Sequence, residues 1–295
     1  MRCLIIGASG QVGGLLLRSC LSEKWECLGT SFKHGSEGLQ PLNICDAAAV
    51  EQCIRTFRPD VVFLPGAMTY VDYCETHAQE CYATNIDGTA NVARAVKSLG
   101  ATLVFFSTEH VFSDSPAEYP EDAPEAPMSV YAKSKVGAEQ KLREILPDRH
   151  LILRASWVYG PEDQRKNFVY RAVSTLRDGK RLQVPEDQYG QPTYSVDLAG
   201  TAILMLNKKI HGTFHAVGPT HITRLAFAKL IAQVFSLDAG LIDGIPTRQL
   251  NQPAPRPLFI RLQRGKLLNI LDFDPIRQPE LALCAMRDGP DKYRP

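Results

Sequence analysis

The first half of the chain alternates short apolar runs with amphipathic stretches. The apolar runs cover residues 2–6, 26–30, 61–64, 102–106 and 150–155. Their length and their mainly apolar residues indicate strands that are buried on both faces of a parallel sheet. Apolar residues at helical spacing lie between them and predict helices after Gly13 and over 47–57, 85–99 and 129–146. This alternation predicts an α/β fold built on a doubly wound parallel sheet.

The pattern loosens in the second half of the chain. It predicts helices over 167–178, 195–207 and 222–236, strands over 181–184 and 212–217, and a proline-rich run over 246–257 before a short tail. We expect residues 1–160 to form the sheet domain, with 194–218 returning to it. Residues 161–193 and 219–295 should form a smaller C-terminal lobe.

Composition narrows the class of protein. A net charge of +1 over 295 residues, without a basic tract, predicts that neither nucleic acid nor a membrane surface is a partner. Glycine follows the first apolar run too soon for a signal peptide, and no run approaches the length of a membrane span, so we expect a cytoplasmic protein. The eight cysteines and seven histidines show no metal-ligand spacing, so we expect reduced thiols and no metal.

A glycine-rich turn connects the first predicted strand to the first predicted helix. Gly7, Gly10 and Gly13 follow the pattern Gly-x-x-Gly-x-x-Gly. Such a turn lets a pyrophosphate approach backbone N–H groups at the positive end of a helix. The first domain is therefore expected to be a Rossmann-like dinucleotide-binding domain.

The end of the second predicted strand bears on which dinucleotide binds. An acidic residue there usually holds the 2′-hydroxyl of NAD, but this chain has no acid between Thr30 and Glu37. Ser31 and Lys33 could instead hold a 2′-phosphate, which favours NADP(H) over NAD(H). The small residues Gly66 and Ala67 follow the third buried strand, where open α/β sheets place their ligands.

Tyr131 and Lys135 are the candidate chemistry of the chain. They are four residues apart in a predicted helix and therefore share one face. An ammonium at about 4 Å, in an effective dielectric of about 20, stabilises a phenolate by on the order of 4 kcal/mol. We therefore expect Lys135 to pull the pKa of Tyr131 from ~10 toward ~7, which suits general acid–base catalysis. Thr108, at the end of the preceding strand, is placed to assist.

With these motifs in order, the chain resembles the extended short-chain dehydrogenase/reductases, and within them the dTDP-4-dehydrorhamnose reductase family. The matching segments are Gly10-Gln11-Val12-Gly13, Thr69-Tyr70-Val71-Asp72 with Glu75, Ser107-Thr108-Glu109-His110-Val111-Phe112, Tyr131-Ala132-Lys133-Ser134-Lys135, Arg154-Ala155-Ser156-Trp157-Val158-Tyr159-Gly160, Asp187-Gln188-Tyr189-Gly190-Gln191-Pro192-Thr193 and Arg256-Pro257. They run from residue 7 to about 262.

This resemblance implies NADPH-dependent reduction of a 4-keto group on a nucleotide-linked deoxysugar. Tyr131 would donate the proton, Lys135 would hold the nicotinamide ribose, and Thr108 would hydrogen-bond the carbonyl oxygen. The resemblance also implies that Gln11, Val12, Asn43, Ile44, Gly66, Ala67 and Met68 line the cofactor. Glu109, Trp157 and Arg256 would lie on the substrate side.

Departures from the family pattern keep alternatives open. Glu109 stands where the family usually has aspartate, and Phe259-Ile260 stand where it has polar residues. Leu15 replaces the glutamate of members whose dimers are bridged by metal, so the resemblance implies no metal. The alternatives are an epimerase or dehydratase of nucleotide sugars, and a non-enzymatic NADP-binding protein, since the chain also resembles the regulatory β-subunits of methionine adenosyltransferase. A homodimer through the helices near 85–99 and 130–146 is an expectation by likeness.

Overall fold

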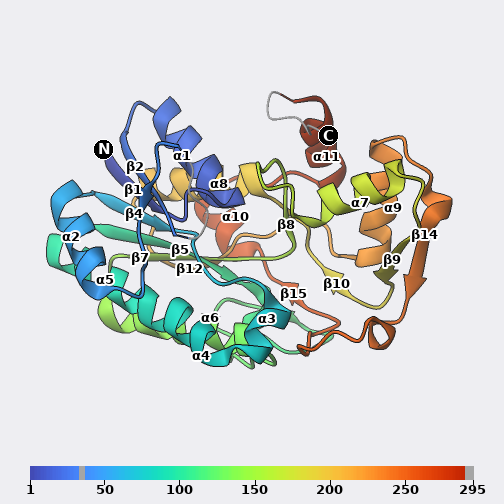
Figure 1. Cartoon of the computed structure of the whole chain (residues 1–295), viewed down its shortest axis with the longest axis horizontal. Coiled ribbons are helices and arrows are strands. Elements are labelled where there is room, and N and C mark those ends of the chain that lie inside the picture. Colours follow the sequence, from blue (N-terminus) through green and yellow to red (C-terminus); the bar gives the residue numbers. More distant parts are fainter. Residues whose placement is uncertain (33–36, 290–295) are drawn as a thin grey trace.

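The computed structural model describes residues 1–32 and 37–289, and its centre is a parallel sheet of seven strands (Figure 1). The strand order is β12-β7-β5-β4-β1-β2-β3, and each neighbouring pair is parallel. The strands are β1 (Arg2–Ile6), β2 (Glu26–Ser31), β3 (Gln40–Pro41), β4 (Val61–Leu64), β5 (Thr102–Thr108), β7 (His150–Ala155) and β12 (Gly212–His215). The predicted doubly wound α/β sheet is confirmed.

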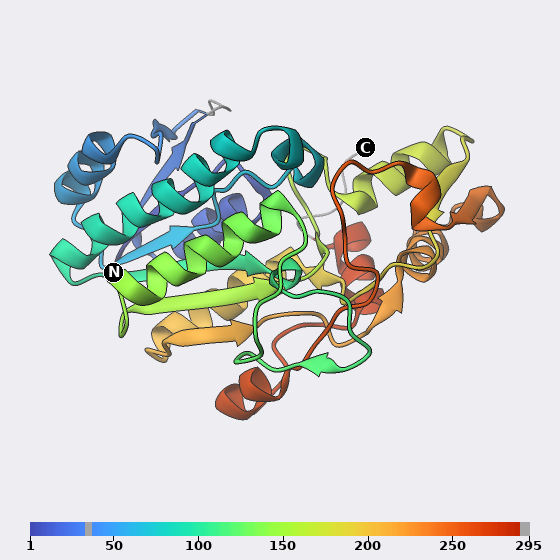
Figure 2. The same cartoon turned by 90° about the horizontal axis from the view of Figure 1, so that it is seen from below.

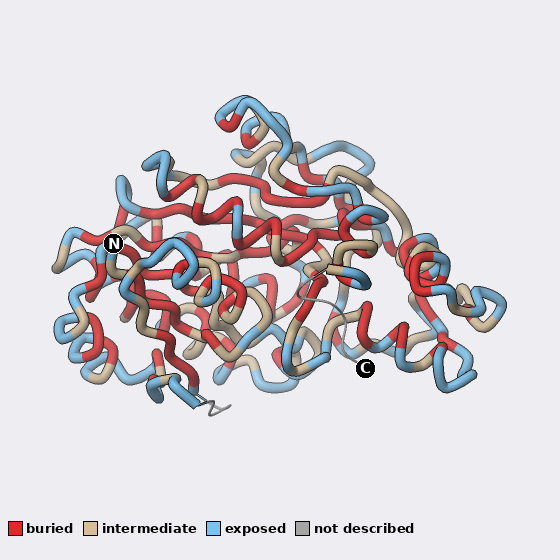
Figure 3. Tube along the Cα trace, turned by 90° about the horizontal axis from the view of Figure 1, so that it is seen from above, coloured by how far each residue is buried: buried red, intermediate tan, exposed pale blue. Residues whose placement is uncertain are grey.

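Helices cover both faces of the sheet because its strands are apolar on both faces. Along β1, Cys3 and Ile5 pack toward one face, while Leu4 and Ile6 pack toward the other. The first face is covered by α1 (Gln11–Ser22), α8 (Ser195–Asn207) and α10 (Gly265–Leu271), and the second by α2 (Ala47–Phe57), α5 (Gly88–Leu99) and α6 (Val130–Ile145). Figure 2 shows α5 and α6 side by side over the second face, and Figure 3 shows buried residues along the strands between the two layers.

A second core lies beside the carboxyl ends of the strands (Figure 1). It is formed mainly by α7 (Phe168–Arg177), α9 (Arg224–Val234), α11 (Pro279–Asp288), β9 (Leu182–Pro185) and β14 (Ile242–Ile245). Two-residue strands complete this half and its junction with the sheet: β6 (Glu118–Tyr119), β8 (Val158–Tyr159), β10 (Tyr189–Gly190), β11 (Thr193–Tyr194), β13 (Ile222–Thr223) and β15 (Arg261–Leu262).

Two segments differ from the sequence prediction. The helix expected from residue 85 is instead a π-helical turn over Ala83–Asp87 that leads into α5, preceded by α3 (Val71–Thr76) and α4 (Ala78–Tyr82). The expected short tail contains α10 and α11, because its apolar residues meet the two cores. All eight cysteines are free thiols. None of the helices in the described part of the chain is long and apolar enough to cross a membrane.

Candidate active site

The glycine-rich turn after β1 is crowded by neighbouring backbone. A Cβ on Gly13 would lie 2.1 Å from the carbonyl oxygen of Gly7, and one on Gly7, whose φ is +93°, would lie 2.6 Å from the Cα of Gly66. Only glycine fits these positions, which lets α1 begin close to the ends of β1 and β4. Gly10 is the N-cap residue of α1 and has no side chain to occupy the first N–H groups. Those N–H groups, at the positive helix end, can hold a pyrophosphate.

A groove of about 420 Å³ opens beside this turn, between α1 and the loop that follows β8. Its lining residues are Ala8, Ser9, Gly14, Leu17, Arg18, Glu37, Leu39, Asp163, Gln164 and Lys166. The Gln164 amide donates a hydrogen bond of 2.8 Å to the carbonyl oxygen of Ser9 and thereby ties the loop to the turn. Arg18 and Lys166 put two cations beside the place for a dinucleotide, and sequence reasoning missed both because they are 148 positions apart.

The remaining residues expected to line the cofactor lie around the same turn, with varied exposure. Ser31 is buried at the end of β2, and Lys33 lies outside the described residues. Asn43 accepts a hydrogen bond from the Cys45 N–H, and Ile44 is buried against Gly88. The Gln11 amide donates to the Gly160 carbonyl oxygen and to Ser195, and Val12 packs on the core. Gln11 therefore joins the turn to the second half of the chain.

One buried amide holds the loop after β4 against α6. The Met68 N–H donates to Asn85 Oδ1 at 2.8 Å, and Asn85 Nδ2 donates to the Met68 carbonyl oxygen at 3.0 Å and to Ser134 Oγ at 2.8 Å. Ser134 lies between Tyr131 and Lys135 in α6. Asn85 therefore fixes the segment Gly66-Ala67-Met68 relative to the two candidate catalytic residues. It sits in the π-helical turn, a deviation that is frequent at functional sites.

Tyr131, Lys135 and Thr108 meet at the carboxyl end of β5. Thr108 ends β5, and its hydroxyl acts on the phenol of Tyr131, whose pKa it lowers. Lys135 is buried on the same face of α6 as Tyr131, and its Nζ donates to the Phe106 carbonyl oxygen at 2.7 Å. The Ser129 hydroxyl caps α6, and Glu75 accepts from the Val130 N–H at 3.0 Å. Both ends of this contact are thus fixed, the strand by the sheet and the helix by its cap.

The expected pKa shift of the tyrosine is wrong for this structure. Burial raises the pKa of Tyr131 above its ordinary value, and the Thr108 hydrogen bond offsets only part of that rise. Burial lowers the pKa of Lys135 to about 7, against the opposing effect of Glu139. The physical reason is that both groups are desolvated, and desolvation favours the neutral form of each. At neutral pH, Tyr131 therefore holds its proton.

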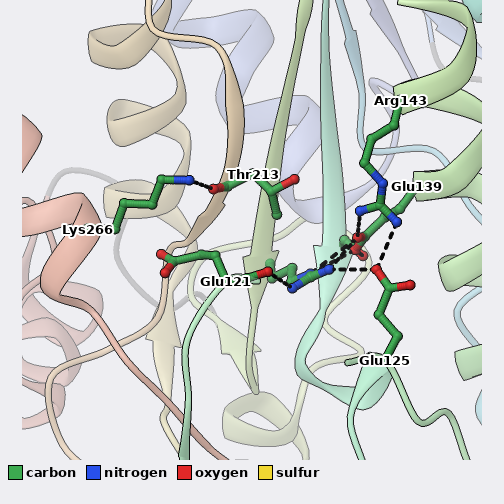
Figure 4. A network of polar contacts seen from close by, with 8 residues as sticks. Glu121, Glu125, Glu139, Arg143, Thr213 and Lys266 are labelled. Carbon is green, nitrogen blue, oxygen red and sulfur yellow. Dashed lines mark hydrogen bonds and ion pairs between the residues drawn. The ribbon is translucent and has the colours of Figure 1, made fainter. Parts of the chain in front are cut away.

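Four residues after Lys135, the buried carboxylate of Glu139 anchors α6 to the sheet (Figure 4). Glu139 is fully buried and accepts from Ser107 Oγ at 2.5 Å and from Arg154 Nη2 at 2.7 Å. Figure 4 shows Arg143 and Glu125 converging on the same point, where Arg143 donates to Glu139 at 3.1 Å and to Glu125 at 2.8 Å. This network fixes the register between β5, β7 and α6, and so the position of the lysine.

Near the tyrosine, two side chains each carry a buried polar atom that has no partner in the described chain. Glu109 is 3% exposed, and its Oε2 has no hydrogen bond within the described chain. Burial raises its pKa to about 8, against the opposing effect of the Ser156 hydroxyl. The ring of His110 lies 6.2 Å from the Tyr131 ring, and its Nδ1 also lacks a partner among the described residues. The ring of Trp157 lies beneath the guanidinium of Arg224 at 3.5 Å. Arg224 escaped sequence reasoning because nothing local marks it.

Arg256, which the resemblance implied on the substrate side, pairs with α3 in this structure. Its Nη1 and Nη2 donate to the two carboxylate oxygens of Asp72 at 2.9 and 2.8 Å. The guanidinium holds the pKa of Asp72 below its ordinary value. Arg256 thereby connects the proline-rich segment to the sheet domain, and its charge reaches His110.

Comparisons with known proteins agree with this geometry. The family described as the RmlD substrate binding domain matches residues 1–286. The chain is 31% identical over 288 residues to a dTDP-4-dehydrorhamnose reductase of Streptomyces griseus, covering 96% of this chain and 91% of the relative. A crystal structure of the Clostridium acetobutylicum reductase of that name has a TM-score of 0.89 at 29% identity, covering 98% and 99% of the two chains. The Bacillus anthracis reductase in complex with NADP has a TM-score of 0.88 at 29% identity, covering 96% of each.

Proposed function

Since the chain belongs to the dTDP-4-dehydrorhamnose reductase family, among the extended short-chain dehydrogenase/reductases, we propose that it reduces the 4-keto group of a nucleotide-linked deoxysugar with NADPH. Its class is that of an NAD(P)-dependent reductase of nucleotide sugars. The position of the keto group and the choice of NADPH are the proposed part. Tyr131, Thr108 and Lys135 at one sheet edge, beside the glycine turn, carry the proposal.

The residues present fit a dinucleotide. The glycines of the turn carry no Cβ and Gly10 provides no side-chain cap, so a pyrophosphate can approach the N–H groups at the N-terminus of α1. Arg18 and Lys166 line the adjoining groove and supply positive charge for a 2′-phosphate. Met68, held by Asn85, and the buried Lys135 would border the nicotinamide end.

NADPH, when bound, supplies the hydride that the carbonyl carbon accepts. Tyr131 gives its phenolic proton to the carbonyl oxygen, and the product is a secondary alcohol. Thr108 donates a hydrogen bond that stabilises negative charge on the same oxygen. Protonated Lys135 then returns a proton to the phenolate and becomes a neutral amine, a transfer for which a pKa of about 7 suits it.

The test is a turnover assay with matched variants. Wild-type protein mixed with NADPH and dTDP-4-keto-6-deoxysugars should consume NADPH, and Tyr131→Phe should lower kcat by on the order of 10²–10⁴-fold because it cannot donate the proton. Tyr119→Phe removes a hydroxyl that donates to the Ser113 carbonyl oxygen and that has no role in the proposed reaction, so this control should keep activity. Absence of turnover with every 4-keto sugar would contradict the proposal. Tightly retained NAD(P)⁺ without net consumption would instead indicate an epimerase or dehydratase.

The proposed division into domains separates a cofactor-binding part from a substrate-binding part. We propose that residues 1–160 with 194–218 carry the cofactor and that 161–193 with 219–295 carry the substrate. The helix α10 packs with α1 and α8 on the sheet and would be a second return to the first half.

A homodimer through α5 and α6 also remains a proposal, and the mass measured by analytical ultracentrifugation tests it.

A further inference from the structure

An arginine stacked on aromatic rings faces the substrate side of the site. Arg224 is the first residue of α9, after the N-cap Thr223. Its guanidinium carbon lies 3.5 Å from the centroid of the Trp157 ring and 4.8 Å from that of Phe168. Stacking occupies the faces of the guanidinium plane, whereas its N–H donors lie in the plane. Within residues 1–32 and 37–289, no hydrogen bond or ion pair of this guanidinium is found.

Two further side chains at this place each carry one buried atom without a partner in the described chain. Glu109 is 3% exposed, and its Oε2 has no partner in the described chain. The same holds, within those residues, for Nδ1 of His110. The charge of Arg224 acts on both side chains. Buried polar atoms in native proteins are nearly always hydrogen-bonded, so the two unmet atoms of Glu109 and His110, next to the half-buried and unpaired guanidinium, point to a ligand.

The charge balance indicates which kind of ligand. Glu109 and Arg224 do not approach within ion-pair distance of each other in the described structure, since no salt bridge joins them. A pKa of about 8 keeps most of the Glu109 carboxyl protonated at neutral pH. The 11 residues of α9 place their positive helix end at Arg224. The place is therefore net positive and rich in hydrogen-bond donors.

We propose that Arg224 binds an anionic oxygen group of the substrate and so determines which nucleotide sugars the enzyme accepts. This inference rests on the proposed function, because it assigns a contact to the same substrate. Two parts of such a molecule carry this chemistry: the diphosphate that joins sugar to nucleoside, and a carboxylate on the sugar ring. The planar fork of arginine matches either group with two parallel hydrogen bonds.

Calorimetric titration of the NADP⁺-saturated protein separates the two sources. One arm compares dTDP with thymidine, and the other compares UDP-glucuronate with UDP-glucose. Arg224→Met keeps the apolar stem and should weaken binding of the anionic member at least tenfold. A diphosphate contact predicts loss for dTDP and for both UDP-sugars, with thymidine unchanged. A carboxylate contact predicts loss for UDP-glucuronate alone.

Controls keep the result decisive. Arg55→Met removes an exposed arginine of α2 and should bind like the wild type. Arg224→Lys keeps the charge without the planar fork and should recover part of the affinity. The proposal is overturned if Arg224→Met binds every ligand like the wild type, even with a lowered Tm, or if wild-type protein binds none of them. Hydride transfer is not measured, so a failure of the proposed reductase activity is detected separately.

Discussion

At the scale of single residues, burial governs the proposed chemistry more than pairing does. Tyr131 and Lys135 share one helix face, yet each is shifted toward its neutral form because both are removed from water. The sequence pattern identified the pair and its spacing but not its surroundings. A pKa depends on desolvation by many residues distant in the chain, and no local pattern encodes that.

The pKa of Lys135 makes stability depend on pH. Between pH 7 and 10.5, the ordinary pKa of lysine, Lys135 binds a proton in the unfolded chain but not in the folded one. The wild type therefore gains stability as the pH rises through this range and loses it as the pH falls toward 7. Lys135→Met removes this dependence, and its stability relative to the wild type should be greatest near about pH 6 and shrink by about pH 9.5. Urea unfolding at both pH values measures the difference. Exposed Lys133→Met is the control, and an unchanging difference for Lys135→Met would refute the prediction.

The carboxylate of Glu139 is the second residue whose change should be costly. Glu139→Gln removes the fully buried countercharge of Arg154 and leaves only the partly exposed Glu125, so the free energy of unfolding should fall by about 3 kcal/mol. Chemical denaturation measures the loss. Glu51→Gln, which breaks an exposed pair in α2, should cost no more than about 0.5 kcal/mol. Equal losses in the two variants would show that the buried network contributes no special stability.

At the scale of elements, the sequence predicted best what local periodicity determines. The strands at 2–6, 61–64 and 150–155 and the helix at 195–207 have the predicted bounds, because each buries an uninterrupted face. The π-helical turn at Ala83–Asp87 was not predicted, since it results from the contacts of Asn85 with Met68 and Ser134. The helices after residue 264 were missed because their apolar faces meet two different cores.

The π-helical turn yields a prediction of its own. Asn85→Ala removes the hydrogen bonds that hold the Met68 backbone, each contributing about 1 kcal/mol, so NADPH should bind roughly tenfold more weakly. The KM for the sugar should change little, because the side chains proposed to contact the sugar are held by other elements. Fluorescence titration with NADPH and steady-state kinetics provide the two readouts. Asn207→Ala, at the end of α8, is the control, and a rise in the sugar KM alone would contradict this role.

At the scale of the whole molecule, the segment from residue 251 to 262 ties the two halves together. Asp72 binds Arg256 and the Ala254 N–H, and Asp114 accepts from the N–H groups of Leu258 and Phe259. This explains why the proline-rich run is ordered although it contains little helix or strand. The sequence indicated only its prolines, since its partners come from the sheet domain.

Removal of one of these acceptors should loosen the segment without unfolding the protein. In Asp114→Ala, the amides of Leu258 and Phe259 lose their acceptor, and their hydrogen exchange should accelerate at least tenfold, while that of β5 stays unchanged. Mass spectrometry of exchange in peptides over 251–262 measures this. Asp122→Ala, an exposed acid nearby in sequence, should exchange like the wild type. Unchanged protection in Asp114→Ala would show that the segment is held mainly elsewhere.

The double contact of Asn85 has a consequence for how such an enzyme can diversify. One side chain sets the spacing between the loop that would border the hydride donor and the helix that would carry the proposed proton donor. The separation of this loop and this helix is therefore fixed. Trp157, Phe168 and Arg224 pack together on other elements. Substitutions at these three positions can therefore change which sugar is accepted without altering the distance between the proposed hydride and proton donors.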